Sequence, residues 1–491
     1  MTTTDQPVPV PVRADRAAGV VLASACGDAL GAGYEFGPPL GADTPVLMKG
    51  GGSFGWKPGE WTDDTQMALA ILTPLAEGGP RLESIEAGFR AWYASDPADV
   101  GNQTRAVLGQ SGPLAEVAAA HLTSKPGSAG NGSLMRTGPV ALAHPGDPEA
   151  IAELARAISA LTHPGDDCED ACVLWSVAID HTIHHAPDSR HHWDWADAVR
   201  AGLVHLPDDR RSRWEALIDE AATAEPVDFH RNNGWVVNAF QAALAAACAT
   251  PVPHGDRPGD HLRLALERAV RGGSDTDTVA AIAGALLGAR WGATAVPFSW
   301  RRLLRGHRVY GEPTLDAADL ERMARRAFNG GRPGAQDWPG VAKLVDYYQT
   351  HFADRPRRTT IGGVDFGNVH ALAEAFDDGV DTVISLCRMG TDDVPTGVEH
   401  HVIGLLDTTE AENPNLVLLL AEVVDGIAAL KAEGRHVFVH CVQAQNRTPT
   451  VAAAWLVHEG ATPDDAVSEA ARLLNRPKPF LISAVHKSVS G

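Results

Sequence analysis

Cysteine is scarce in this sequence, with six residues in a chain of 491, and the six are scattered. Small secreted folds held together by disulfides carry cysteine at a much higher density. The scarcity therefore excludes a disulfide framework and indicates a reducing compartment, so we expect a cytoplasmic protein. The six residues are Cys26, Cys168, Cys172, Cys248, Cys387 and Cys441.

Positive charge is the second shortage. Lys and Arg number 41 against 62 Asp and Glu, which gives a formal net charge of -21. Non-specific nucleic-acid binding needs a basic face, and anionic membranes attract basic segments. We therefore expect neither partner. An anionic small molecule can still bind where backbone amides or a metal offset its charge.

Long apolar runs are also missing. No stretch approaches the roughly 20 residues that a membrane-spanning helix needs. Residues 1–12 lack the basic start and apolar core of a secretory signal. Here Pro7, Pro9 and Pro11 alternate with valine, a pattern typical of extended, unordered chain. We expect a disordered tail over residues 1–14 and no membrane association.

The length of the chain and a change of pattern near residue 330 predict two domains. Helical patterns at 16–32, 65–75, 82–95, 148–161, 167–184, 235–249, 260–271 and 279–291 predict an all-α domain over residues 15–330. A Gly- and Pro-rich stretch then predicts a linker at 331–355. Beyond it, β-rich runs at 382–386 and 436–440 alternate with helical patterns. Residues 356–491 therefore favour an α/β domain with a largely parallel sheet, folding separately from the first.

Two clusters of acidic and hydroxyl side chains each precede a helix that is apolar on every side. A helix cap needs only one such residue, so each cluster has more acid than capping uses. Buried carboxylates are costly unless they are paired, hydrogen-bonded or bound to metal. The two clusters together favour hard oxygen ligands for Mg²⁺ or a similar cation over ordinary caps. Their members are Thr62, Asp63 and Asp64 in the first, and Asp275, Asp277 and Thr278 in the second.

Further segments extend this pattern in chain order, and together they carry a family resemblance. They are Gly27-Asp28-Ala29-Leu30-Gly31, Tyr34-Glu35, Gly101-Asn102-Gln103-Thr104, Gly130-Asn131-Gly132-Ser133-Leu134-Met135-Arg136 and Thr162-His163. Several spaced motifs in order are more specific than one short pattern. With the two acidic clusters, they resemble the motifs of the ADP-ribosylglycohydrolases, the dinitrogenase-reductase-activating glycohydrolase family, over roughly residues 15 to 330.

The resemblance implies a hydrolase that releases ADP-ribose from a modified acceptor with two Mg²⁺ ions, or with Mn²⁺. The six residues of the acidic clusters would hold the metals, which would orient the distal ribose and help to activate water. Glu35 would complete the metal site and handle protons, with Asp99 as a secondary catalytic candidate. Taken alone, Asp99 is equally typical of a plain turn.

The resemblance also implies residues that bind the rest of the substrate. Gly130, Asn131, Gly132 and Ser133 offer backbone amides suited to a pyrophosphate or a ribose. Without the resemblance, a tight turn explains this segment equally well. His163 would lie near the adenosine end.

A second chemical site is predicted near the C-terminus. Cys441 and Arg447 lie between the predicted strand 436–440 and a helical pattern at 451–459. Loop amides and a helix N-terminus attract an anion there, and the same field lowers the pKa of a thiol. An arginine fork binds two phosphoryl oxygens. The segment therefore predicts a phosphate-binding loop with a thiolate nucleophile.

This loop resembles the signature loop of cysteine-dependent, dual-specificity-like protein phosphatases. The resemblance implies that Cys441 is the nucleophile, that Asp407 is the general acid and that Thr448 assists release of the thiolate. One position departs from the family pattern, because Ala444 stands where the family has glycine. A methyl group there crowds the phosphate or disfavours the loop conformation. We expect phosphate binding with slow turnover.

The leading hypothesis is thus a multidomain enzyme, with an all-α ADP-ribosylglycohydrolase-like domain followed by an α/β cysteine-phosphatase-like domain. Its partners would be an ADP-ribosylated protein or small molecule and a phosphorylated ligand. Two alternatives stay open. In the first alternative, the C-terminal phosphatase is the active unit and the first domain senses ADP-ribose. In the second, the chain is an anion-binding scaffold without catalysis. The acceptor, whether arginine, serine, a nucleic-acid end or a metabolite, is also left open.

Overall fold

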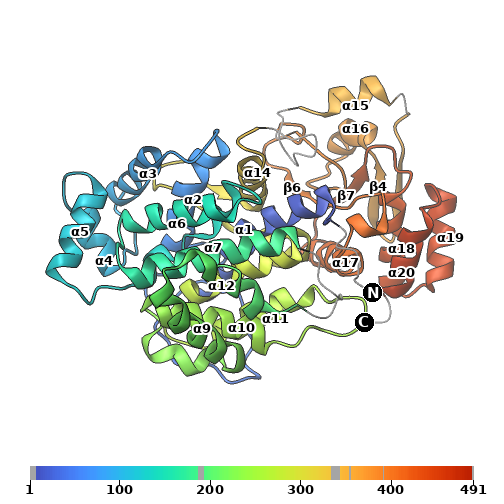
Figure 1. Cartoon of the computed structure of the whole chain (residues 1–491). Helices are drawn as coiled ribbons and strands as arrows, with labels where there is room; N and C mark the ends of the chain where they lie inside the picture. The colour runs from blue at the N-terminus through green and yellow to red at the C-terminus, as the bar shows by residue number, and fades with distance from the viewer. Residues whose placement is uncertain (1–6, 186–192, 333–342, 353–354, 391, 489–491) are drawn as a thin grey trace. The chain divides into compact units, whose positions relative to one another are not determined.

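Two helices of small residues pack unusually closely in the first part of the chain (Figure 1). They are α1 (Val10–Gly31) and α12 (Thr276–Trp291). A Cβ placed on Gly288 would lie 2.0 Å from the carbonyl oxygen of Gly19, and one on Gly31 would lie 2.5 Å from the Cα of Asp277. Only glycine permits backbones to approach this closely. The contact sets the end of α1 against the start of α12.

The computed structural model describes residues 7–185, 193–332, 343–352, 355–390 and 392–488. The chain divides into two compact units. The first comprises residues 1–252, 261–296 and 303–335, and the second comprises residues 253–260, 297–302 and 336–491. In the described part of the chain, no helix is both long enough and apolar enough to cross a membrane.

The first unit is helical, as the sequence predicts. Five predicted helices, at 82–95, 148–161, 167–184, 235–249 and 260–271, have both ends within one residue of the observed ones. Besides α1 and α12, the helices are α2 (Asp63–Ala76), α3 (Leu82–Ala94), α4 (Asn102–Leu108), α5 (Leu114–Ser124), α6 (Pro148–Ala160), α7 (Asp166–His184), α8 (Trp195–Arg200), α9 (Asp208–Thr223), α10 (Val236–Ala249), α11 (Asp260–Arg271) and α14 (Ala317–Phe328). A two-stranded ladder joins β1 (Arg305–Gly306) to β2 (Leu315–Asp316).

The N-terminal helix begins earlier than the sequence predicts. Residues 10–14 belong to α1, although they lie in the predicted disordered tail of 1–14. Pro11 is compatible with this start because it occupies the first turn, where its missing N–H has no helical partner in any case. Residues 1–6 lie outside the described part of the chain.

The second unit is built on a five-stranded sheet with the order β3-β4-β7-β5-β6. The strands are β3 (Arg358–Ile361), β4 (Val364–Asn368), β5 (Thr382–Ser385), β6 (Glu399–Val402) and β7 (Val437–Cys441). Only the β3–β4 pair is antiparallel, and β4–β7, β7–β5 and β5–β6 are parallel. The helices are α16 (Leu372–Asp377), α17 (Leu416–Ala432), α18 (Arg447–His458), α19 (Pro463–Leu473) and α20 (Pro479–Lys487). The predicted α/β domain with a largely parallel sheet is present.

The predicted linker at 331–355 contains a helix. Residues 333–342 and 353–354 lie outside the described part of the chain, but α15 (Val345–His351) is described. Its Tyr348 is buried with the apolar core of the second unit, and its hydroxyl donates to the Arg388 carbonyl. Composition alone did not indicate this helix.

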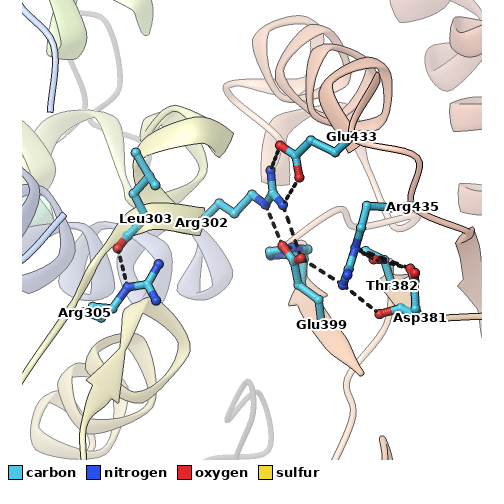
Figure 2. Close-up of polar contacts among 9 residues, drawn as sticks. Arg302, Leu303, Arg305, Asp381, Thr382, Glu399, Glu433 and Arg435 are labelled. Atoms are coloured by element: carbon cyan, nitrogen blue, oxygen red, sulfur yellow. Dashed lines mark hydrogen bonds and ion pairs between the residues drawn. The ribbon is translucent and has the colours of Figure 1, made fainter. Parts of the chain in front are cut away.

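The second unit also includes a short segment from earlier in the chain, within α13 (Phe298–Leu303). Phe298 is part of the buried apolar cluster of this unit. Figure 2 shows Arg302 between Glu399 and Glu433, with hydrogen bonds of 2.5 and 2.6 Å. Glu399 also accepts from Arg435. The charged residues of this network thus tie residues 297–302 to β6 and α17.

Candidate functional site

The last turns of α1 fix the start of α2 through a single buried carboxylate. Asp28 accepts hydrogen bonds from the backbone N–H groups of Thr62 and Thr65, at 2.9 and 3.0 Å, and from the Thr65 hydroxyl at 2.6 Å. Thr62 itself caps α2. The first predicted acidic cluster is therefore held rigidly by a residue from a distant motif.

Carboxylates from α1, α2 and α12, and from the loop positions Glu35 and Asp275, gather into two overlapping groups. Asp28, Asp64 and Asp277 form one group, and Glu35, Asp275 and Asp277 form the other. Within each group, one oxygen from every member lies within 4.8 Å of the others. Asp277 belongs to both groups, so a pair of cations would share it as a ligand.

Two fully buried oxygens in these groups have no hydrogen-bond partner. They are Oδ1 of Asp64 and Oε2 of Glu35, both buried. A buried carboxylate oxygen without a partner is expensive unless a cation binds it. The donor set is all carboxylate and hydroxyl oxygen, which suits Mg²⁺ or Mn²⁺. The residues present therefore fit a divalent metal.

The electrostatics of the cluster point the same way. Burial, with repulsion from Asp275, Asp99 and other acids, raises the pKa of Glu35 to about 9. Burial and neighbouring carboxylates also raise the pKa values of Asp63, Asp64 and Asp277 well above the usual range. Crowded acids of this kind hold protons at neutral pH unless a cation replaces them.

Glu35 and Asp275 are brought together by a strained piece of backbone. Phe36 and Ser274 have φ values of 61° and 64°, which are uncommon for residues other than glycine. Between them runs a short antiparallel bridge, in which Phe36 N–H donates to the Ser274 carbonyl at 2.7 Å and Ser274 N–H donates to the Gly37 carbonyl at 2.9 Å. Such strain persists where the surrounding structure demands it, which is typical of functional sites.

Two asparagines position Asp275. Asn131 donates to its Oδ2 at 2.8 Å, and Asp275 N–H donates to Oδ1 of Asn233 at 3.2 Å. The side chain of Asn233 also donates to the Gly273 carbonyl. Asn131, predicted to bind substrate, thus contacts a candidate metal ligand through its amide.

The carboxylates open into a cavity of about 560 Å³. That volume is in the range of sites for small molecules and nucleotides. Ten predicted site residues line it: Glu35, Asp63, Asp99, Gly130, Asn131, Gly132, His163, Asp275, Asp277 and Thr278. Thr62 and Asp64 do not line it, but Asp64 accepts from both Thr62 and Thr278. Ser133 is buried and accepts from the Cys172 thiol.

Gln103 holds two of the pocket-lining segments together. Its side-chain amide donates to the Thr162 carbonyl at 3.3 Å, and its carbonyl oxygen accepts from Gly130 N–H at 3.2 Å. The motif at 101–104, which sequence reasoning placed in a loop, lies at the start of α4. It therefore shapes the pocket beside His163.

The second unit brings three of its predicted residues into one place. Cys441 ends β7 at the middle of the sheet, and Arg447 begins α18. The Arg447 guanidinium donates to the Leu386 carbonyl at 2.6 Å, and its Nε lies 3.6 Å from Oδ2 of Asp407. Asn446 donates to the same Asp407 oxygen at 3.4 Å.

Two further residues of this loop, Thr448 and Ala444, are buried within the fold. The Thr448 hydroxyl is buried and donates to the Gly367 carbonyl at 3.1 Å, so its hydrogen is used within the fold. Ala444 is fully buried and has φ 52°, in the left-handed region that favours glycine. The departure from the family pattern therefore falls at a position where the backbone conformation itself favours glycine.

Sequence reasoning missed Asp28 and Asn233 as site residues. Asp28 stood within a quoted motif, but only the fold shows that its carboxylate meets those of Asp64 and Asp277. Asn233 lies in no recognised motif, and nothing in its local pattern distinguishes it from a turn residue.

Comparison with known proteins covers mainly the first unit. The family model described as ADP-ribosylglycohydrolase matches residues 9–336. ADP-ribosyl-[dinitrogen reductase] glycohydrolase of Rhodospirillum rubrum is 30% identical over 299 residues, covering 58% of this chain and 89% of that protein. ADP-ribosylarginine hydrolase Tri1 of Pseudomonas putida (strain GB-1) is 31% identical over 294 residues, covering 58% of this chain and 73% of that protein.

A solved structure described as an ADP-ribosylglycohydrolase-related protein complex matches with a TM-score of 0.50 and 28% identity, covering 65% of this chain and 99% of that chain. The family model ends at residue 336. Solved phosphatase structures each cover 28% or less of this chain, with TM-scores of 0.25 or less. Comparison therefore does not establish a phosphatase domain.

Proposed function

The chain belongs to the ADP-ribosylglycohydrolase family, and on that premise we propose that its first unit is a Mg²⁺-dependent hydrolase with two metal ions. It cleaves the glycosidic bond between ADP-ribose and a modified acceptor. The observation that carries this proposal is the pair of carboxylate groups sharing Asp277, with partnerless buried oxygens on Asp64 and Glu35. These residues lie in or beside a pocket of suitable size.

The residues of the site have separate roles in binding metal, orienting the ligands and transferring a proton. Asp28, Asp64, Asp275 and Asp277 hold the cations, and Thr62, Thr278 and Asn131 orient these carboxylates. Bound metal would supply a Lewis acid that polarises oxygen ligands. Glu35, whose pKa is raised by burial and by neighbouring acids, handles the proton that passes between water and the departing acceptor. Asp63 and Asp99 line the same pocket and keep its wall acidic.

We propose arginine-linked ADP-ribose as the first acceptor to test. Two of the relatives are named for dinitrogen reductase and for ADP-ribosylarginine. A cationic guanidinium leaving group is also compatible with the acidic wall formed by Glu35, Asp63 and Asp99.

The test is turnover by the full-length protein on acceptors linked through arginine, serine, a nucleic-acid end or a free metabolite. Each is assayed with Mg²⁺, with Mn²⁺ and with EDTA. Release of ADP-ribose that EDTA abolishes and Mg²⁺ restores is the expected result. Binding of ADP-ribose without turnover on any acceptor would favour the sensor or scaffold alternatives instead.

A second function is proposed for the second unit, because Cys441, Arg447 and Asp407 lie around one strand-to-helix loop. This unit would bind a phosphoryl group through the loop and Arg447, with Cys441 as nucleophile and Asp407 as acid. Vanadate binding that Arg447→Ala removes would support it. The phosphorylated ligand would be rejected as a partner if neither vanadate nor an aryl phosphate binds.

A further inference from the structure

His163 is a buried imidazole whose ring nitrogens face different surroundings. Its side chain is 1% exposed and lines the pocket. Nδ1 lies 2.7 Å from the Thr162 hydroxyl. Within the described part of the chain, no hydrogen bond is formed by Nε2. A buried polar atom that faces a pocket without a protein partner indicates a ligand.

The Thr162 hydroxyl is constrained from its other side by Arg136. The guanidinium NH2 group of Arg136 lies 2.6 Å from Thr162 Oγ1. Arginine only donates hydrogen bonds, so Oγ1 must accept. The hydroxyl hydrogen then has one hydrogen-bond acceptor within reach, which is Nδ1 of His163. Because Thr162 is fully buried, leaving that hydrogen unpaired would be costly.

The charge on Arg136 also keeps the imidazole neutral. Arg136 is fully buried, contacts Sδ of Met67 at 3.5 Å and lies 4.2 Å from the Phe89 ring centroid. Burial is the main cause that lowers the pKa of His163 well below 6.5, and the charges of Arg136 and His121 lower it further. A neutral imidazole that accepts at Nδ1 carries its hydrogen on Nε2.

Glycine keeps the space over Nε2 open. A Cβ on Gly132 would lie 3.1 Å from Nε2, and one on Gly130 would lie 3.6 Å from it. Side chains at these positions would crowd the donor. The same cavity is lined by the cation of Lys125, which favours an anionic group in this pocket.

We propose that Arg136 and Thr162 act as positioning residues that lock His163 as the Nε2–H tautomer, so that it donates a hydrogen bond to a diphosphate oxygen of the substrate. The inference rests on the proposed function for the identity of the substrate. It adds an uncharged donor whose direction is set before the ligand arrives. Nε2 of His163 lies close to Gly130 and Gly132. The glycines of this loop would therefore leave room for the imidazole donor, in addition to offering their own backbone amides.

The test combines a spectroscopic measurement with binding, both on the full chain. Histidine-selective ¹⁵N spectra identify the tautomer of His163, with His163→Gln to assign its signals. We expect Nε2–H in the wild type without ligand. In Thr162→Val, which removes the hydroxyl, the signals shift towards a mixture of tautomers, and Thr162→Ser restores the wild-type pattern.

Binding is measured with ADP-ribose, ADP and adenosine. Loss of one ordered hydrogen bond predicts about threefold to tenfold weaker binding of ADP-ribose and ADP to Thr162→Val. Adenosine, which lacks the diphosphate, should bind the two proteins equally. Thr182→Val is the matched control, because Thr182 is also fully buried but its hydroxyl donates to the Ala178 carbonyl. This control should bind all three ligands as the wild type does.

Three outcomes would overturn the proposal: an Nδ1–H or doubly protonated His163 in the wild type, unchanged ADP binding by Thr162→Val, or an equal loss of adenosine binding. The last would place the base, rather than the diphosphate, at Nε2. If Thr162→Val does not fold, the comparison is made with Thr162→Ala against Thr162→Ser. Failure of the proposed function is distinguishable, because the wild type would then bind ADP through His163 without releasing ADP-ribose from any acceptor.

Discussion

The two candidate sites of this protein are assembled in opposite ways. The site in the first unit collects carboxylates from α1, α2, α12 and the loop at Glu35, which are far apart in sequence. The site in the second unit is mostly one loop between β7 and α18, joined by Asp407. The first concentrates negative charge, whereas the second sets a thiol beside an arginine. The charge of the first therefore favours a cation, and that of the second favours the anion proposed for it.

The strongest way to break this comparison is to remove the shared ligand. Asp277→Asn should lower ADP-ribose release by more than about a hundredfold, because even residues that orient metal ligands are worth 10-fold to 100-fold. The measurement is turnover against Mg²⁺ concentration. Asp63→Asn is the informative partner, since Asp63 lines the pocket but belongs to neither carboxylate group. From the sequence we expect Asp63→Asn to lower turnover as much as Asp277→Asn does. From the geometry we expect a smaller loss of turnover. Full turnover with an unchanged Mg²⁺ titration in both variants would remove the metal assignment.

A milder change sharpens the role of Asn131. Asn131→Ala leaves every carboxylate in place but removes the hydrogen bond to Asp275. We expect metal affinity to fall by about 10-fold to 100-fold, as for other residues that orient ligands. Titration of Mg²⁺ or Mn²⁺ measures it. A loss of turnover that saturating metal does not rescue would instead favour direct contact between Asn131 and the substrate.

The acidic site should also make stability depend on pH when metal is absent. The pKa of Glu35 is raised to about 9 in the folded protein, against about 4.3 in an unfolded chain. A carboxyl with a raised pKa stabilises the fold below its unfolded pKa, and this contribution disappears as the pH rises towards the folded value. The Tm in EDTA should therefore fall between about pH 5 and pH 9, and Mg²⁺ should restore it most at the upper end.

Glu35→Gln gives the control for this pH dependence, because it removes one titrating group without removing the side chain. Its Tm in EDTA should fall less steeply than that of the wild type. Parallel pH profiles for the two proteins would show that Glu35 is ionised at neutral pH, contrary to the expected effect of burial.

The smallest effect is expected in the second unit. Ala444 holds a left-handed backbone conformation, which costs a non-glycine residue about 1–2 kcal/mol. Ala444→Gly should therefore raise turnover of an aryl phosphate by about threefold to tenfold, and Cys441→Ser should remove it. Release of ADP-ribose should be indifferent to both changes. Wild-type turnover equal to that of Ala444→Gly would show that the alanine is well accommodated.

Local patterns were sufficient where one segment carries both structure and chemistry. The loop from Cys441 to Arg447 was predicted between a strand and a helix, and the structure has β7 and α18 there. The acidic clusters were also visible, because Asp275 and Asp277 precede a helix that is apolar on every side. The role of Asp28 could not be derived in this way. It depends on the glycine contacts that bring α1 against α12, and such contacts are a property of tertiary packing.

The path of the chain between its two units limits how the protein can be taken apart. Residues 253–260 and 297–302 fold with the second unit, although both lie inside the family match of 9–336. A truncation after residue 336 would remove the apolar cluster that buries Phe298. It would also leave Arg302 without its partners Glu399 and Glu433. The separated C-terminal piece would lack the same contacts. Recombination that exchanges whole domains at residue 336 is therefore disfavoured, because each product would lack contacts that its own unit needs.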